Sequence, residues 1–347
     1  MTDVVTGLDS QGMFAAAAAL PEQVVEAMTV ARGLDGLPDR RSVENVVVLG
    51  MGGSGIAGDV LAATAGPFMS VPVVVVKSYE LPAFVGDGSL VFAVSFSGDT
   101  EETVEAATEA AMQGASVVAV TSGGALAELA AGWGSPVVAV PASIPQPRAA
   151  LGAMAVPPLI VLEEIGLFPG ASQWTDLAVQ QLQRRRDQLV QPGNAAEKLA
   201  RRIGATFPLV HGGGAVGATA AQRWKTQFNE NAKIPAFWAA QPELCHNEVC
   251  GWGQHGDVTR QLVTLIALRH DGEHPQVMRR FALVADMVLE VVAAVEEVEA
   301  EGEGELAQLL DLVLMGDFVS LHVAAQAGLD PGPVPAITEL KLRLTEG

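Results

Sequence analysis

The chain has 347 residues, 49% hydrophobic and 17% charged, and its 20 basic and 40 acidic residues give a formal net charge of −20. This composition favours packed cores over disorder, and at roughly 150 residues per domain the length suggests two domains. Because DNA and anionic membranes favour basic surfaces, the acidic balance argues against nucleic-acid and membrane partners. It does not exclude a small anionic substrate.

We expect neither export nor membrane insertion. The N-terminal stretch MTDVVTGLDSQGMFAAAAAL lacks the basic start of a signal peptide. No uninterrupted apolar run approaches the ~18 residues that cross a bilayer, and the only cysteines are Cys245 and Cys250. The sequence therefore predicts a cytoplasmic protein without structural disulfides.

The first half of the chain alternates between predicted strands and helices. An Ala-rich helix over 13–33 lies in a predicted N-terminal helical segment, 1–40. A first α/β domain is predicted over 41–166, with five apolar strands at 45–50, at 71–78 and within SLVFAVSF, SVVAVT and SPVVAVPA. Continuous apolar strands that alternate with helices are typical of a parallel sheet covered on both faces.

The second half repeats this pattern. A charged helix, TDLAVQQLQRRRDQLVQ, ends at Pro192-Gly193 and predicts a linking helix over 167–195. Strand, glycine turn and helix then return at 208–228, and a second α/β domain with a C-terminal helix is predicted over 196–347. The chain thus contains two similar α/β halves.

A glycine-rich turn follows the first predicted strand. Gly50, Gly52 and Gly55 have the spacing G-x-G-x-x-G, and such a turn at a helix N-terminus favours a phosphate because N–H groups and the helix dipole point at it. A dinucleotide site would add an acid about 20 residues later. The nearest acid, Glu80, comes late and follows Lys77. A dinucleotide-dependent oxidoreductase is therefore the weaker alternative.

A second turn, SFSGDTEET over 95–103, also follows a predicted strand and opens a helix. Ser95, Ser97 and Thr100 place three hydroxyls beside free backbone N–H groups, which suits a phosphate monoester. The alternative is that Ser97 or Asp99 only caps the helix that follows, a common use of both residue types.

Six segments in chain order carry a specific resemblance: GMGGSGIAGD, SFSGDTEET, VPASIPQPRAALG, RWKTQFNENAKIPAF, ELCHNEVCGW and PVPAITELK. The chain resembles the archaeal-type bifunctional phosphoglucose/phosphomannose isomerases, which have two sugar isomerase (SIS) domains. The resemblance implies an α/β fold of two flavodoxin-like α/β/α sandwich domains with parallel sheets. It also implies an aldose–ketose isomerase that interconverts fructose 6-phosphate with glucose 6-phosphate and mannose 6-phosphate through a cis-enediol.

The same resemblance implies a role for individual residues. Glu230 in NEN would be the base, and Arg148 in PRAALG would stabilise the enediolate. His246 in CHNE would open the sugar ring, reaching the site of the other subunit of a homodimer, and Lys341 in ELK would assist at the ring oxygen. The 6-phosphate would be bound by Gly53, Ser54, Ser95, Ser97 and Thr100. No metal or redox cofactor is implied.

The chemistry asks for such groups independently. Moving a proton between C2 and C1 needs a carboxylate base, a cation near the developing oxyanion, and an acid–base group that opens the ring. Each residue also has a structural alternative. Glu230 could pair with Lys233, His246 could be a core histidine, Lys341 could be a solvated lysine, and Arg148 could form a salt bridge at a helix start. A non-catalytic sugar-phosphate-binding regulator is the alternative function.

Cys245, His246, Cys250 and His255 have the spacing C-H-x3-C-x4-H, which is not a usual zinc pattern, and adjacent Cys and His side chains do not easily reach one ion. We therefore expect no metal site.

Two departures from the family pattern stand out. Phe96 and Asp99 replace the tyrosine and asparagine of S-Y-S-G-N-T, and Asp99 adds a negative charge beside the expected phosphate. The family also places a small threonine near its terminal lysine, thought to make room for both C2 epimers. This stretch offers Gly332, Val334 and Thr338.

Overall fold

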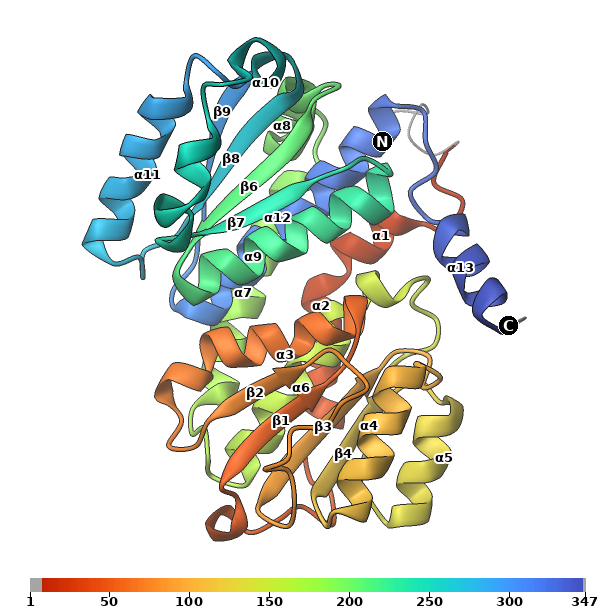
Figure 1. Cartoon of the computed structure of the whole chain (residues 1–347). Coiled ribbons are helices and arrows are strands. Elements are labelled where there is room, and N and C mark those ends of the chain that lie inside the picture. Colours follow the sequence, from red (N-terminus) through yellow and green to blue (C-terminus); the bar gives the residue numbers. More distant parts are fainter. Residues whose placement is uncertain (1–7, 346–347) are drawn as a thin grey trace.

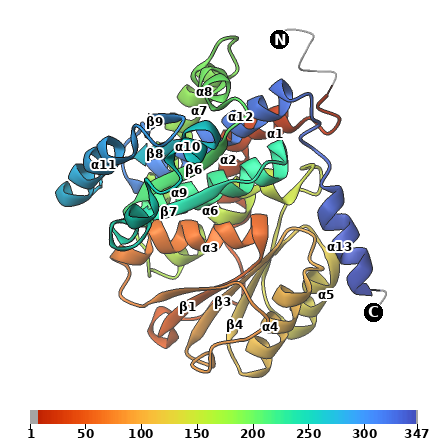
Figure 2. The same cartoon turned by 45° about the horizontal axis from the view of Figure 1, so that its top comes forward.

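The computed structural model describes residues 8–345, so the first seven residues of the predicted N-terminal segment lie outside it. The described residues form two parallel sheets, one in each half of the chain, with helices packed on both faces of each sheet (Figures 1 and 2). The predicted α/β fold with two parallel sheets is confirmed.

The first sheet has the strand order β2-β1-β3-β4-β5, and all neighbouring strands are parallel. Its strands are β1 (Asn45–Leu49), β2 (Val73–Val76), β3 (Ser89–Ser95), β4 (Ser116–Thr121) and β5 (Val137–Ala139). Val46 and Val48 point into one core, and Val47 and Leu49 point into another. Because side chains alternate along a strand, a sheet buried on both faces needs apolar residues at every position.

Helices supply the other side of each core. The core that contains Val46 and Val48 is shared with α3 (Gly52–Thr64) and α6 (Leu151–Glu164). The opposite core is shared with α4 (Glu101–Met112) and α5 (Gly124–Trp133). The first sheet is therefore the middle layer of an α/β/α sandwich.

The second sheet has the order β7-β6-β8-β9, again all parallel. Its strands are β6 (Phe207–Gly213), β7 (Phe237–Gln241), β8 (Val263–Arg269) and β9 (Ala294–Glu299). One face packs on α8 (Ala195–Ile203), α9 (Gly214–Gln227) and α12 (Glu305–Gln326), and the other on α11 (Pro275–Val288). A short helix, α10 (Gly256–Leu262), precedes β8.

The remaining helices join the two halves. α1 (Met13–Ala18) and α2 (Leu20–Val30) replace the single helix predicted over 13–33, because Ala19 leaves the helical conformation at φ −82° and ψ 3°. α2 packs on α6 and on α7 (Ala171–Leu189), and α7 packs on α12. α7 lies within the predicted linking segment, while the exact domain limits remain predictions. The last described helix is α13 (Pro335–Thr345).

The predicted elements omitted strand β7. Its first two residues, Phe237 and Trp238, are 58% and 39% exposed, and β7 lies at the edge of the second sheet. An edge strand does not need the continuous apolar run that marks a central parallel strand. The segment FWAAQ therefore carries little of the signal by which the other strands were predicted.

Helix α12 has the length and hydropathy of a membrane-spanning helix, but 94% of its apolar 18-residue window is buried inside the fold. It packs against α7, α8 and α9. Its hydrophobicity is therefore explained by its place in the core between neighbouring helices.

One buried ion pair fastens α7 to α12. Asp311 on α12 is fully buried and accepts hydrogen bonds from Nε and Nη2 of Arg185, at 2.7 and 2.6 Å. Gln181 Nε2 at 2.8 Å and the amide of Glu301 at 2.9 Å bind the same carboxylate. A buried charge of this kind is tolerated because its lone pairs are all engaged.

We expect Asp311→Ala to lower the free energy of unfolding by about 3–5 kcal/mol, because it removes the buried partner of the Arg185 guanidinium and leaves only the exposed Glu301 paired with it. Urea denaturation followed by circular dichroism measures this loss. Glu22→Ala is the control, because it removes a surface partner of Arg186 that is 58% exposed, and it should cost less than about 1 kcal/mol. Equal losses for the two variants would contradict the prediction.

Candidate active site

Two predicted phosphate turns meet at the C-terminal edge of the first sheet. β1 ends at Leu49 before the glycine turn, β3 ends at Ser95 before the serine turn, and the two strands are parallel neighbours. Ser54, in the first turn of α3, is buried, and its Oγ accepts the amide of Phe96 at 3.1 Å. This bond holds the two turns against each other.

The serine turn is shaped by its own side chains. Ser95 Oγ lies 2.9 Å from Thr100 Oγ1 and accepts the amide of Gly98 at 3.1 Å. Ser97 is exposed, and its Oγ accepts the amide of Asp99 at 3.2 Å. The Asp99 carboxylate accepts the amide of Ala125, in the first turn of α5, at 2.9 Å.

These contacts test the alternative that Ser97 or Asp99 caps the helix after the serine turn. Helix α4 has Thr100 as its N-cap residue, without a side-chain capping bond. The idea that Ser97 or Asp99 caps α4 is therefore wrong. Asp99 instead binds an amide of the neighbouring helix α5, where a helix N-terminus favours its negative charge.

A third segment touches the glycine turn. A Cβ atom at Gly53 would lie 2.9 Å from the backbone nitrogen of Arg148, so only glycine lets the main chain at Pro147–Arg148 approach this closely. Arg148 belongs to a 3-10 helix, Pro147–Ala149, and is 1% exposed. The packing thereby sets Arg148 directly beside the predicted phosphate turn.

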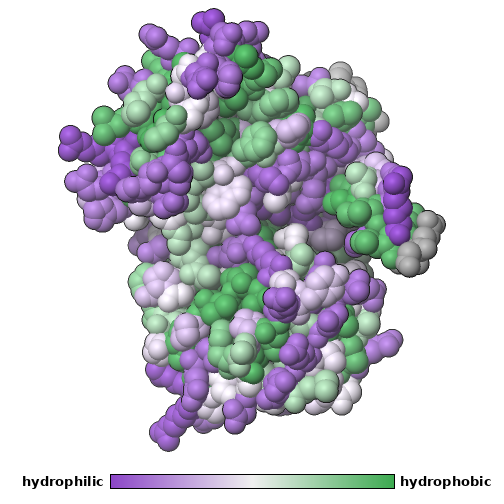
Figure 3. All heavy atoms as spheres, viewed as in Figure 1, coloured by the Kyte–Doolittle hydropathy of each residue, from purple (hydrophilic) through white to green (hydrophobic). Residues whose placement is uncertain are grey.

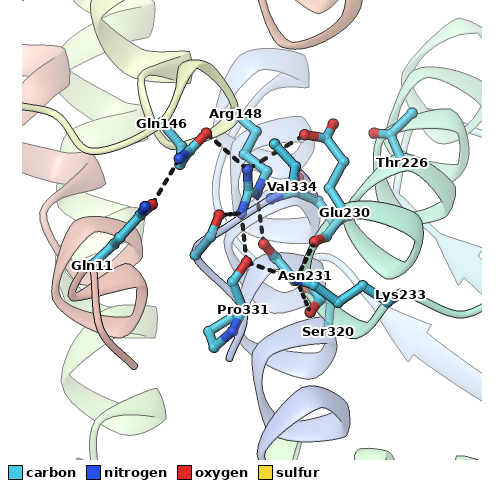
Figure 4. A network of polar contacts seen from close by, with 12 residues as sticks. Gln11, Gln146, Arg148, Thr226, Glu230, Asn231, Lys233, Ser320, Pro331 and Val334 are labelled. Atoms are coloured by element: carbon cyan, nitrogen blue, oxygen red, sulfur yellow. Dashed lines mark hydrogen bonds and ion pairs between the residues drawn. The ribbon is translucent and has the colours of Figure 1, made fainter. Parts of the chain in front are cut away.

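The guanidinium of Arg148 joins distant parts of the chain (Figure 4). Its Nε donates to Asn231 Oδ1 at 2.7 Å, and its Nη2 donates to the carbonyls of Pro331 and Gly332 at 2.6 and 2.8 Å. The remaining nitrogen, Nη1, makes longer contacts, 3.3 Å to Gln146 Oε1 and 3.4 Å to Glu230 Oε2. Nε and Nη2 thus fix the side chain, while Nη1 is the nitrogen held least tightly.

Glu230 and Asn231 lie in a π-helical turn, Phe228–Ala232, that ends α9. Turns of this type are rare and frequently occur at functional sites. The Glu230 side chain is 25% exposed, so its carboxylate faces both Arg148 and solvent. Lys233 donates to the backbone carbonyl of Glu230 at 2.9 Å, and among the described residues the ion-pair partner of the Glu230 carboxylate is Arg148.

A buried group of charged side chains binds the backbone of Arg148. Arg223 Nη2 donates to the carbonyl of Arg148 at 2.5 Å and to both oxygens of Asp317 at 3.1 Å. Gln227 also donates to Asp317, at 2.7 Å. Asn231 Nδ2 donates to Ser320 Oγ at 2.9 Å, which ties the π-helical turn to α12.

Burial shifts the titration of these groups. Burial raises the pKa of Asp317, and the neighbouring Arg223 acts against this rise. Burial lowers the pKa of Arg148, while the Glu230 charge raises it, and an arginine still keeps its proton. Burial lowers the pKa of Lys233, and repulsion from Arg148 lowers it further by a smaller amount. The site therefore holds a permanent cation beside a partly exposed carboxylate.

Two predicted residues lie apart from this cluster. His246 is exposed at the end of a 3-10 helix, Glu243–His246, so the core-histidine alternative is wrong. Lys341 is exposed on α13, which projects from the side of the molecule (Figures 1 and 2). Within residues 8–345, neither side chain has a hydrogen bond or ion pair with Arg148 or Glu230. Their roles stay predictions.

The cysteines of the C-H-x3-C-x4-H segment are not bound to each other in the part of the chain that the structure describes. Cys245 and Cys250 are free thiols, and Cys245 Sγ donates to Gln241 Oε1 at 3.0 Å. Among the described residues, no group of three or more His, Cys, Asp or Glu side chains is arranged to hold a metal ion.

The second glycine turn, between β6 and α9, packs against α11. A Cβ atom at Gly213 would lie 2.8 Å from Val277 and 3.0 Å from Phe281, both on α11. His270 Nε2 lies 2.9 Å from the carbonyl of Gly213. Of the two glycine turns, the one in the first half is therefore the one that packs against Arg148.

Comparison with known proteins identifies the family of the chain. The SIS domain family model matches residues 41–131, and the bacterial phospho-glucose isomerase C-terminal SIS domain model matches residues 193–344. A bifunctional phosphoglucose/phosphomannose isomerase of Caldicellulosiruptor bescii is 32% identical over 96% of this chain and 99% of its own length. The chain belongs to the bifunctional phosphoglucose/phosphomannose isomerase family.

Other members of the phosphoglucose/phosphomannose isomerase family and solved structures extend the likeness. A member from Aquifex aeolicus is 34% identical over 88% of this chain and 92% of its own length. The crystal structure of a putative phosphosugar isomerase from Clostridium difficile has a TM-score of 0.71, covering 92% of this chain and 95% of that one. That structure is 12% identical, so it supports the fold alone.

Several residues of this candidate site were not singled out in the sequence. Asn231 stood within the NEN motif, but nothing there showed that it binds Arg148. Asp317 carried one available signal, shared with Asp311: it is an acid inside the largely apolar helix predicted at 305–328. Of the three candidates for the family threonine, the Gly332 carbonyl binds Arg148, Thr338 is exposed on α13, and Figure 4 places Val334 among the residues around Arg148.

We expect Arg148→Lys to destabilise the phosphoglucose/phosphomannose isomerase fold by about 1–3 kcal/mol. A lysine cannot reproduce the guanidinium fork, so buried acceptors on Asn231, Pro331 and Gly332 lose partners. Urea denaturation measures the loss. The control is Arg343→Lys at a site 73% exposed, which should change stability by less than about 0.5 kcal/mol. An Arg148→Lys protein as stable as wild type would refute the bonding role.

Proposed function

We propose that this chain is a phosphohexose isomerase that interconverts fructose 6-phosphate with glucose 6-phosphate and mannose 6-phosphate through a cis-enediol. The observation that carries the proposal is the pairing of Glu230 with Arg148, whose Oε2 and Nη1 atoms lie 3.4 Å apart. Membership of the phosphoglucose/phosphomannose isomerase family supports the same substrates.

Glu230 is the proposed base. Its carboxylate is partly exposed, so a substrate carbon can approach it, and the π-helical turn holds its backbone in place. A base of this kind takes the proton from C2 of the aldose and returns it to C1. A positioned carboxylate suffices for both transfers because the two carbons are adjacent.

Arg148 is the proposed electrophile. Removal of the C2 proton places negative charge on the sugar oxygens, and a pre-oriented cation in a site shielded from water stabilises that charge strongly. Nη1 is the nitrogen available for this role, because its contacts with Gln146 and Glu230 are longer than the hydrogen bonds of Nε and Nη2. The bonds at Nε and Nη2 keep the guanidinium from reorienting during the reaction.

The 6-phosphate is assigned to the two adjoining turns. Gly53 and Ser54 stand at the start of α3, where backbone amides and the helix dipole favour an anion. Ser97 is exposed on the neighbouring serine turn. The contact between Ser95 and Thr100 shapes that turn. Because Gly53 also contacts Arg148, a phosphate bound here leaves the rest of the sugar directed toward Arg148 and Glu230.

Ring opening is assigned to His246 of a second subunit. His246 is exposed and has no contact with the Arg148 cluster of its own chain within the described residues. Phe237 and Trp238, on the edge strand that precedes it, are 58% and 39% exposed, and such apolar exposure favours association. A homodimer in which His246 enters the partner's site accounts for both features.

Lys341 is assigned to the ring oxygen in the same assembly. It lies on α13 with three apolar neighbours, Ile337, Leu340 and Leu344, which are 43%, 60% and 71% exposed. Figure 3 shows hydrophobic atoms at the surface where α13 projects. Residues 337, 340, 341 and 344 share one helical face, so covering the apolar residues also moves Lys341 out of solvent.

Glu230→Gln tests the proposed chemistry. It keeps the shape of the side chain but removes the base, so kcat for fructose 6-phosphate should fall by about 10²–10⁴-fold while KM changes little. The variant should also stop exchange of the C2 proton of glucose 6-phosphate with solvent deuterium. Retention of more than about a tenth of wild-type kcat would show that Glu230 is not the base. Sugar-phosphate binding by a wild-type protein with no turnover would favour the regulatory alternative.

A mixing experiment tests the composite site. Glu230→Gln and His246→Ala subunits should each be poorly active, but co-expression should restore about a quarter of wild-type activity, because half of the dimers are mixed and each has one complete site. Co-expression of two copies of the same variant is the control. No gain on mixing would mean that His246 acts within its own chain or outside the site.

A further inference from the structure

The segment that carries His246 has little regular structure of its own. Between β7 and α10 it forms only two 3-10 helices, Glu243–His246 and Glu248–Gly251. Helices this short have poor hydrogen-bond geometry and do not fix their own orientation. The direction of the His246 side chain must therefore be set by contacts between this segment and the rest of the fold.

Apolar packing holds the segment down without orienting it. Leu244 is 1% exposed, and Val249 and Trp252 pack in the same cluster as Leu209 and Val288. Apolar burial is non-directional, so these contacts define where the segment lies more than how it is turned.

One polar contact with the sheet supplies the direction. Nε2 of His211 lies 2.8 Å from Oε1 of Glu248, so a protonated Nε2 donates to the carboxylate. His211 is 1% exposed on the central strand β6, with Ala239 of β7 and Ala267 of β8 as its register partners. Among the described residues, Glu248 is the only hydrogen-bond partner of this imidazole. A buried imidazole needs such a partner.

The link from Glu248 to His246 is short and internally bonded. Asn247, the residue between them, accepts the amide of Glu248 with its Oδ1 at 2.7 Å. Its Nδ2 donates to Glu243 Oε1 at 2.9 Å. The side chain of Asn247 thereby bridges the two 3-10 helices, so a displacement of Glu248 is passed on to His246.

We propose that His211 and Glu248 are positioning residues that aim His246 at the sugar ring in the partner's site. The proposal rests on the ring-opening role proposed above for His246. His211 has no contact with Arg148 or Glu230 among the described residues, so it acts through His246 and not on the substrate. Nothing else in the mechanism uses this buried imidazole.

A double-mutant cycle tests the proposal. His211→Leu should lower kcat for glucose 6-phosphate by about 10- to 100-fold, as displaced catalytic groups do. In a His246→Ala background the same change should cost less than about 2-fold, because no catalytic imidazole is left to misplace. His211→Gln, whose amide nitrogen can still donate to Glu248, should recover most of the wild-type rate.

His270→Leu is the matched control, since His270 is also a buried histidine of the second sheet, bound to a backbone carbonyl. Its effect on kcat should be the same with and without His246. Circular dichroism and urea denaturation check folding. If His211→Leu does not fold, Glu248→Ala replaces it, because the Glu248 side chain is 25% exposed.

The outcomes separate the two proposals. A loss of equal size in both backgrounds, or no loss in either, would overturn the positioning role and leave the role of His246 intact. A His246→Ala enzyme with unchanged kcat would overturn the ring-opening role, and the positioning role with it. Loss in the wild-type background alone, with recovery in His211→Gln, supports both.

Discussion

The burial of one guanidinium organises this molecule. Arg148 is 1% exposed, and a charged group removed from water needs acceptors arranged around it. Those acceptors come from the π-helical turn at the end of α9 and from the segment before α13, while Arg223 binds the Arg148 backbone from α9. The first sheet, the second half and the C-terminal segment therefore meet at this side chain.

The site gathers positive charges in a chain whose net charge is negative. The protein carries a formal net charge of −20, yet Arg148, Arg223 and Lys233 stand together at the junction of its halves. Asp317 and Glu230 offset part of this positive charge. A cluster of cations in an acidic molecule is compatible with an anionic substrate, because interactions beyond about 8–10 Å are largely screened by salt.

The sequence was sufficient for the fold and for the segments that build the site. Continuous apolar strands predicted two parallel sheets, and the quoted motifs contained Arg148, Glu230 and both turns. The edge strand β7 was missed because an exposed Phe237 and Trp238 do not read as a buried parallel strand. The contacts of Arg148 with Asn231, Pro331 and Gly332 could not be predicted, because residues 83 to 184 positions apart meet only through packing.

Neither could the sequence show how differently the two halves use a similar turn. In the first half, the glycine turn packs against the main chain of Arg148 and is bonded to the serine turn. In the second half, the turn packs against Val277 and Phe281 of α11, and His270 binds the carbonyl of Gly213. Two similar domains would otherwise offer two anion sites of comparable strength. Because it is the first turn that has the serine turn and Arg148 beside it, one chain should titrate with a single equivalent of sugar phosphate, so its duplicated architecture does not bring a duplicated stoichiometry.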